Sequence, residues 1–280
     1  MKIRQISVFL CAVFFLATAL GRDLADQCDP ASDANAGLRS YAVEKKTYAF
    51  ALGFDLRNYK YEEPGFVEHN GLMFGLYAQL EANFSNSGTG YFETSLHYGK
   101  LTYKGALCDT GTGICSPYET SNQTDIISRT VGIYYLPMSG ALSVGGGLGL
   151  RYLQDTVSEK GFYARIGTWG FLPIATKIDF PMAPNIRGLF ELEYDYVFYG
   201  GIRSNLSQVS SSFEDVYMHQ SGYGINLNFG AVIAGMLQTS LYYQTWNLNE
   251  SDSVVSGGLQ FVEPKNNSTS IGVKLGYKFQ

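Results

Sequence analysis

The sequence predicts an all-β protein whose long antiparallel strands run up and down and close into a transmembrane barrel. Three observations lead there: apolar residues alternate at period two over long segments, aromatic residues are abundant, and charged residues are scarce. The 280 residues include 21 Tyr, 18 Phe and 2 Trp, and only 16% are charged. Soluble globular domains carry about 25% charged residues. This composition also excludes disordered, collagen-like and coiled-coil chains.

The N-terminus predicts export. Lys2 and Arg4 precede a short apolar stretch that ends in small residues, which makes residues 1–21 a secretory signal peptide. Removing these two cations changes the formal net charge from -5 to -7, and such an acidic chain is a poor partner for nucleic acid. We expect residues 22–45 to form a polar periplasmic segment and residues 46–280 to form the barrel.

Alternation predicts the strands one by one. In Leu72–Phe84, seven apolar residues alternate with other residues over a segment that would rise about 45 Å at about 3.4 Å per residue. A tilted strand that crosses a bilayer needs about that reach. The ten predicted strands are Lys46–Tyr61, Asn70–Phe84, Tyr91–Lys104, Thr124–Leu136, Ala141–Leu153, Gly161–Phe180, Ile186–Arg203, His219–Ile233, Met236–Leu248 and Asn267–Phe279. Eight or twelve strands are the alternatives, and the facing of Gly161–Phe180 is left open because its residues do not alternate cleanly.

The links between strands predict the topology. An even number of strands places both termini on one side, with short turns in the periplasm and long loops outside. The long links are Lys104–Gln123, Ser204–Met218 and Asn249–Asn266. Glu62–His69 and Gln154–Lys160 should also be outer loops but are modest in length.

A soluble β-sandwich is the main alternative, because its buried face would also be apolar at every second residue. Strand length argues against it, and so do aromatic residues near strand ends, which suit the girdles of a membrane barrel. These aromatic residues are Tyr59, Tyr61, Tyr134, Tyr135, Tyr196, Phe198 and Tyr199.

The last strand carries a family resemblance. Ile271-Gly272-Val273-Lys274-Leu275-Gly276-Tyr277-Lys278-Phe279 resembles the terminal strand of bacterial outer-membrane β-barrel proteins, the OmpA-like and small porin-like barrels. The resemblance implies a place in the outer membrane of a Gram-negative bacterium. It also implies that the barrel-assembly machinery recognises Val273, Leu275, Tyr277 and Phe279, although here Gln280 follows the aromatic residue.

Cysteine spacing predicts a disulfide in an outer loop. Cys108 and Cys115 flank six residues, and a local bridge is the natural pairing in an exported protein. A zinc site is disfavoured because paired zinc ligands are normally two to four residues apart and need further ligands nearby. Cys28 is left without an assigned partner.

Charged residues on the small-residue faces of the strands are expected to point into the lumen. The predicted lumen cluster is Glu81, Glu93, Arg151, Glu191, Glu193, Asp195 and Lys274. One interpretation is a network of opposed charges that packs a narrow barrel. The other is a narrow pathway that favours cations.

No catalytic, cofactor or metal motif is found. His69, His97 and His219 are interpreted as isolated, with no pair of aspartates beside them, and no serine lies in a G-x-S-x-G context. We therefore expect a non-enzymatic surface or structural protein, adhesin-like, whose loops bind an extracellular ligand. The alternatives are a small cation-preferring channel and a barrel enzyme that cleaves protein or modifies lipid. Outer-membrane lipid, lipopolysaccharide and the assembly machinery are the expected partners.

Overall fold

The computed structural model describes residues 48–84, 88–108, 115–139, 141–159 and 161–279. The predicted signal peptide and the polar segment 22–45 lie outside these residues. Among the described residues no helix has the length and apolar character needed to cross a bilayer. The helical element in that part of the chain is the three-residue 3-10 turn η2 (Leu206–Gln208).

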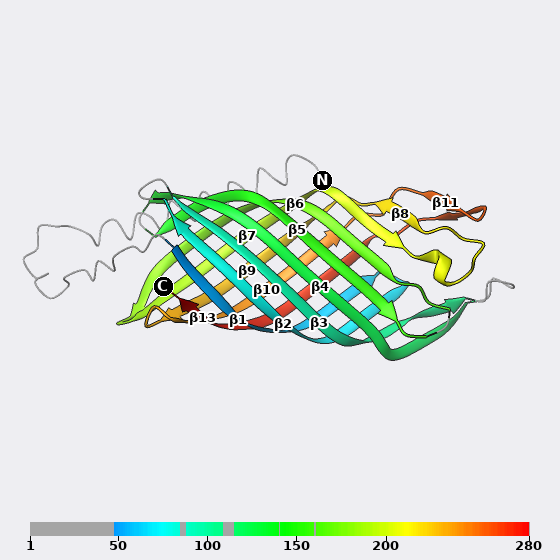
Figure 1. Ribbon diagram of the computed structural model, residues 1–280, viewed down its shortest axis with the longest axis horizontal. Helices are drawn as coiled ribbons and strands as arrows, with labels where there is room; N and C mark the ends of the chain where they lie inside the picture. The colour runs from blue at the N-terminus through cyan, green and yellow to red at the C-terminus, as the bar shows by residue number, and fades with distance from the viewer. Residues whose placement is uncertain (1–47, 85–87, 109–114, 140, 160, 280) are drawn as a thin grey trace, which may run out of the picture.

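Ten antiparallel strands close into a barrel (Figure 1), which confirms the predicted fold class. We call each of them a stave, because one of the ten is divided into two shorter strands. Each stave pairs with its neighbour in the chain, and β1 pairs with β13 to close the ring. One stave is divided into β8 and β9, which both pair with β7. The staves are β1 (Tyr48–Glu63), β2 (Val67–Asn83), β3 (Thr89–Cys108), β4 (Cys115–Ser139), β5 (Leu142–Val157), β6 (Arg165–Ala183), β7 (Ile186–Ser204), β8 (Val216–His219) with β9 (Gly222–Ile233), β10 (Leu237–Leu248) and β13 (Asn266–Phe279).

The outer face of the barrel is apolar over the middle of the strands. Successive side chains of a strand point to opposite faces, so the alternate apolar residues of each stave all face outward. In β13 these are Val273, Leu275, Tyr277 and Phe279, which are 46 to 54% exposed. Toward one end of the barrel, outward positions on neighbouring staves become polar at paired places in the ladder. These positions are Lys60, Asn70, Thr102, Thr245 and Thr269.

This exterior defines the class of protein. Soluble domains seldom expose an apolar surface larger than a few hundred Å². Here the exposed large side chains form a belt around the ring that ends where the polar residues begin. The fold and its outer surface are those of a transmembrane β-barrel.

The prediction for residues 104–123 is wrong, because most of this segment is strand and not loop. β3 and β4 continue as a paired hairpin as far as Cys108 and Cys115. The polar sequence concealed this, since a ladder outside the bilayer needs no apolar face. The links at 62–69 and 154–160 are short for the same reason: β1, β2 and β5 extend further than the apolar pattern does.

The segment whose facing was left open is β6. Its inward residues Trp169, Phe171 and Ala175 are buried, and its outward residues Leu172 and Ile174 are exposed. Alternation is therefore present, but both faces are apolar and the period-two signal disappears from the sequence.

The outer links on one side of the barrel mouth pack into a compact cap. They form the hairpin of β11 (Val254–Ser256) and β12 (Leu259–Phe261), which lies beside β8 beyond the end of the barrel (Figure 1). The cap has its own apolar cluster, built from Tyr163, Leu206, Phe213, Val216, Met218, Val254 and Phe261. Hydrogen bonds between Ser256 and the backbone of Glu214 join two of the links.

Candidate functional site

The interior of the barrel is the candidate site, and its middle is a layer of large apolar side chains. Trp169, Phe171 and Trp246 are at most 2% exposed, and the Phe171 and Trp246 rings meet edge to face with centroids 5.1 Å apart. Tyr59, Met73, Leu101, Ile127 and Leu153 complete this layer. The prediction of a lumen packed by charges and glycines is therefore incomplete, because a hydrophobic core lies inside the barrel as well.

Two buried arginines lie within this layer. The Arg151 guanidinium lies over both indoles, 5.1 Å from Trp169 and 4.9 Å from Trp246, and donates to Ser268 Oγ at 2.9 Å. Arg57 lies over the Tyr59 ring at 5.6 Å. Among the described residues, neither arginine forms an ion pair with a carboxylate within 4.0 Å. Cation–π contact with the aromatic rings supplies part of the electrostatic stabilisation that a carboxylate would give these desolvated guanidinium groups.

Toward the turns at the end where the C-terminal strand finishes, oppositely charged side chains form pairs across the lumen. Lys274 Nζ is 2.6 Å from Glu93 Oε1, and Lys278 Nζ is 3.1 Å from Glu81 Oε2. Arg129 forms a charged hydrogen bond with Glu193, and its Nη2 lies 3.6 Å from Asp195 Oδ2. We call these three groups the inner pairs.

The structure brings most of the predicted lumen residues together but separates one. Glu81, Glu93, Glu193, Asp195 and Lys274 belong to the inner pairs, whereas Arg151 lies in the apolar layer. Glu191 is 6% exposed and lies beside them, lining a cavity of about 30 Å³. That volume holds about two water molecules.

A histidine, an aspartate and a tyrosine meet beside the same cavity. His97 Nε2 is 2.8 Å from Asp55 Oδ2, and the Tyr242 hydroxyl donates to Asp55 Oδ1 at 2.8 Å. His69 Nδ1 lies 3.5 Å from Asp125 Oδ2 nearer the opposite end of the barrel. The interpretation of His69 and His97 as isolated is therefore wrong: the ladder register of β1–β4 brings each beside an aspartate that is distant in sequence.

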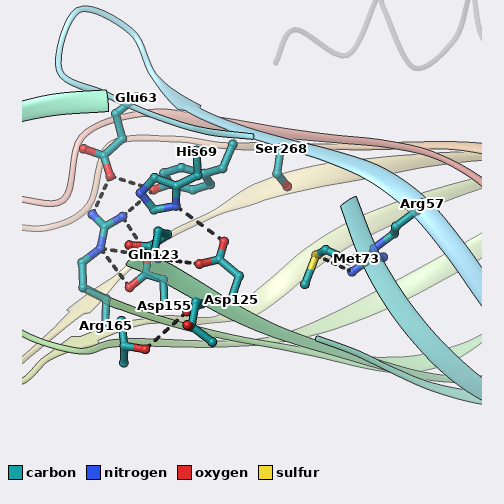
Figure 2. A network of polar contacts seen from close by, with 12 residues as sticks. Arg57, Glu63, His69, Met73, Gln123, Asp125, Asp155, Arg165 and Ser268 are labelled. Atoms are coloured by element: carbon teal, nitrogen blue, oxygen red, sulfur yellow. Dashed lines mark hydrogen bonds and ion pairs between the residues drawn. The ribbon is translucent and has the colours of Figure 1, made fainter. Parts of the chain in front are cut away.

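At the outer end, Arg165 lies between Glu63 and Asp155 (Figure 2). Its Nη1 is 2.5 Å from Glu63 Oε1, and its Nη2 is 3.0 Å from Asp155 Oδ2. A third carboxylate, Glu263, has its Oε1 3.0 Å from Arg165 Nη1. The Tyr61 hydroxyl donates to Glu63 Oε1 at 2.8 Å. We call these five residues the outer cluster.

The sequence contained a signal for part of what was missed. Asp55, Arg57, Tyr59 and Tyr61 alternate with the outward Phe54 and Leu56, as the lumen carboxylates do in their own strands. Asp125 and Arg129 were harder to place, since apolar residues lie on both faces of β4. Asp155 lies on β5, two residues beyond the predicted end of that strand at Leu153. Glu263 lies between β12 and β13, where no alternation operates.

The predicted aromatic girdles are right for some residues and wrong for others. Tyr134, Tyr196, Phe198 and Tyr199 face outward and are 40 to 63% exposed. Tyr59, Tyr61 and Tyr135 point inward and are at most 3% exposed. Position near a strand end does not separate the two groups, because strand parity decides which face an aromatic residue occupies. Phe198 and Tyr199 are consecutive and both face outward because the ladder register shifts opposite them, between Gly170 and Phe171.

Cys108 and Cys115 are directly opposed at the end of the β3–β4 ladder. This register places their backbones where a cross-strand bridge can form, and the disulfide stays a prediction. In the described part of the chain, no group of three or more His, Cys, Asp or Glu residues could hold a metal ion.

Solved structures with a similar fold are bacterial outer-membrane barrels. The β domain of the Bordetella autotransporter BrkA is 11% identical and superposes with a TM-score of 0.41 over 82% of this chain and 99% of its own. The translocator domain of the autotransporter NalP from Neisseria meningitidis is 12% identical, with a TM-score of 0.40 over 96% and 97%. An outer membrane channel from Pseudomonas putida is 8% identical, with a TM-score of 0.39 over 83% and 96%.

All three TM-scores lie below 0.5, so these similarities support no conclusion about the role of this chain. No protein-family model matches the sequence, and no curated protein matches it. The function has to be argued from the interior and the outer mouth of this barrel.

Proposed function

We propose that the protein is a closed, non-catalytic barrel of the bacterial outer membrane that holds its outer loops at the cell surface for binding. The observation that carries the proposal is the apolar layer, in which Trp169 and Trp246 are at most 2% exposed and enclose Arg151. A wide aqueous channel would need this layer to be absent or open. Outer-membrane lipid, lipopolysaccharide and the assembly machinery are the partners that such a protein would meet.

The order of charge along the lumen supports a closed barrel. The outer cluster and the inner pairs both contain more carboxylates than cations, and the layer between them carries Arg57 and Arg151. A cation would have to pass two desolvated guanidinium groups, and an anion would have to pass carboxylates on either side.

Planar-bilayer recording tests the closed lumen. The wild-type protein should give no stable unitary current. Replacing both indoles, in Trp169→Ala with Trp246→Ala, should open a leak, because these two buried side chains fill the middle of the lumen. Leu241→Ala is the matched control, since its side chain is 55% exposed on the outer face. Stable unitary currents from the wild type would contradict the proposal.

The rival function is a narrow cation path, which the acidic cavity favours. Glu93, Glu191 and Glu193 line it together with Arg129 and Lys274. If the wild type conducts, Glu193→Gln should lower the preference for cations. An effect of that substitution on ion preference would support the channel over the closed barrel.

The orientation is tested with tags in two matched tight turns. Gly257-Gly258 at the tip of the β11–β12 hairpin and Ala234-Gly235 between β9 and β10 all have positive φ. A tag at the first turn should bind antibody on intact cells, and a tag at the second should bind only after the outer membrane is permeabilised. The reverse labelling would refute the orientation.

The absence of catalysis is proposed because the serine that lines the cavity beside His97 is engaged by the backbone. Ser95 lines the same cavity as His97, but its hydroxyl lies 3.5 Å from the Arg129 carbonyl, to which it donates. Purified barrel should not turn over peptide or lipid substrates. Turnover that is lost in His97→Ala and kept in His219→Ala would show that the protein is an enzyme.

A further inference from the structure

Glu263 belongs to a segment that lies beyond the end of the barrel rather than to the barrel wall. The segment, residues 249–265, leaves β10, forms the β11–β12 hairpin and returns to β13. Its two ends are joined at Ser251, whose amide donates to the Glu263 carbonyl at 3.0 Å and whose hydroxyl accepts from the Glu263 amide at 2.8 Å. We call this segment the strap.

A single side chain of the strap reaches down into the outer cluster. Glu263 is 3% exposed, and its Oε1 lies 3.0 Å from Arg165 Nη1 and 3.4 Å from the Tyr61 hydroxyl. Arg165 lies on β6, and Tyr61 lies on β1. The contact therefore joins the strap to two staves of the barrel through one carboxylate.

The charges at this contact are unbalanced. One guanidinium serves Glu63, Asp155 and Glu263 at once, at distances of 2.5 to 3.0 Å. Two of these carboxylates belong to barrel strands, whereas Glu263 belongs to the strap. The titratable and charged groups around Glu263 are Tyr61 and Glu63 of β1, His69 of β2, Tyr103 of β3, Asp125 of β4, Asp155 of β5, Arg165 of β6 and Tyr163 of the link before β6.

We propose that the strap is a pH-responsive closure of the barrel mouth, docked through Glu263 onto Arg165 and released as the pH rises through neutrality. Release would expose Arg165 and the acidic groups beneath it to the outside. The proposal concerns the outer mouth alone and does not rest on whether the lumen conducts.

The sign of the pH dependence follows from burial. Removal of Glu263 from water, together with the neighbouring Glu63 and Asp155 carboxylates and against the attraction of Arg165, raises the pKa of its side chain to about 7. In a released strap the same carboxyl would return to about 4.5. The docked form thus retains a proton that the released form loses between these values. Docking is strongest in acid and weakens up to about pH 7, by roughly a hundredfold between pH 5 and pH 8.

Hydrogen exchange of the strap tests this proposal, measured on the full-length barrel in detergent at pH 5 and pH 8 and corrected for intrinsic exchange rates. The probe is the backbone of residues 249–265. In the wild type, protection should fall by roughly a hundredfold from pH 5 to pH 8. Glu263→Gln keeps the shape and remains neutral, so its protection should stay high at both values. Glu250→Gln, an exposed acid in the same segment, should behave as wild type.

Three results would overturn the proposal. The first is wild-type protection that does not change with pH. The second is a pH dependence that persists in Glu263→Gln. The third is protection in Glu263→Gln that is low at both pH values, because a neutral side chain should dock as the protonated acid does. Heat-modifiable mobility in gels reports separately that each variant has folded.

Discussion

The outer cluster and the inner pairs solve the same problem in different ways. Both neutralise carboxylates buried inside a narrow barrel. In the inner pairs, each cation contacts carboxylates of one other strand only, as Lys274 of β13 contacts Glu93 of β3. The outer cluster instead divides one guanidinium among carboxylates from β1, β5 and a segment outside the barrel wall. The inner pairs involve strands of the barrel wall alone, whereas the outer cluster also needs a loop to be in place.

The difference shows which end of the barrel can change without unfolding. Each inner pair joins strands of the barrel wall, which the ladder of backbone hydrogen bonds holds in place. Removing Glu263 from Arg165 breaks a contact between the strap and the outer cluster and leaves the strand ladder in place. The outer end is therefore where a response to the environment can be located.

Arg165→Met should have the largest effect on stability. It leaves three buried carboxylates without their cation, and loss of one partner from a buried ion pair costs about 3 to 5 kcal/mol. Denaturant unfolding of the barrel in detergent measures the loss. Arg165→Lys is the control and should recover part of the stability. Equal stability of Arg165→Met and the wild type would mean that the cluster is not held together by charge.

Leu275→Lys provides a reference from the lipid-facing side of the same barrel. Leu275 is 54% exposed on the outer face of β13, and a cation near the middle of a bilayer costs about 2 to 4 kcal/mol. Folding into lipid vesicles, followed by heat-modifiable mobility, measures it. Folding as efficient as that of wild type would reverse the facing assigned to this strand.

Lys274→Met should be milder than Arg165→Met. It leaves Glu93 buried, at a cost of about 1 to 3 kcal/mol, with the Tyr91 hydroxyl still donating to that carboxylate at 2.8 Å. Adding Glu93→Leu should restore part of the loss, since the double variant leaves no buried charge at this pair. The double-mutant cycle gives the coupling, and a coupling of zero would show that the two side chains are neutralised by other groups.

Lys60→Met should have the smallest effect. Lys60 pairs with Glu62 and Glu68 on the outer face beyond the apolar belt, with its side chain 46% exposed. Exposed pairs contribute about 0 to 1 kcal/mol, so the free energy of unfolding should change by less than about 1 kcal/mol. A larger loss would mean that this rim contributes more than solvent-exposed pairs do.

Most of the fold could be predicted from the sequence because every second residue of most staves is apolar and faces outward. Leu72–Phe84 is an example, because its alternate apolar residues face outward. The strand predicted at Asn70–Phe84 is observed at Val67–Asn83. Ends were missed wherever strands continue beyond the bilayer, as β3 and β4 do, since no lipid imposes a pattern there.

Contacts inside the barrel were predictable by face but not by partner. The charges of β7 were expected in the lumen, yet the sequence could not show that Arg129 of β4 meets Glu193 or that Asp55 meets His97. These contacts depend on the tilt of the staves and on side chains that reach across the ring. The contribution of Glu263 was beyond prediction, because its place follows from the packing of the cap.

The inner pairs have a consequence for the order of assembly. Glu81 and Glu93 lie early in the chain, and their cations lie 197 and 181 residues later on the last stave. Contacts so distant in sequence form late, since a large loop must close first. Until β13 docks against β1, both acids lack their cations, and a strand displaced by two residues would match each cation to the wrong level. The contacts of Lys274 and Lys278 therefore form only when the ring is closed and β13 is in the correct register, so both events belong to one cooperative last step.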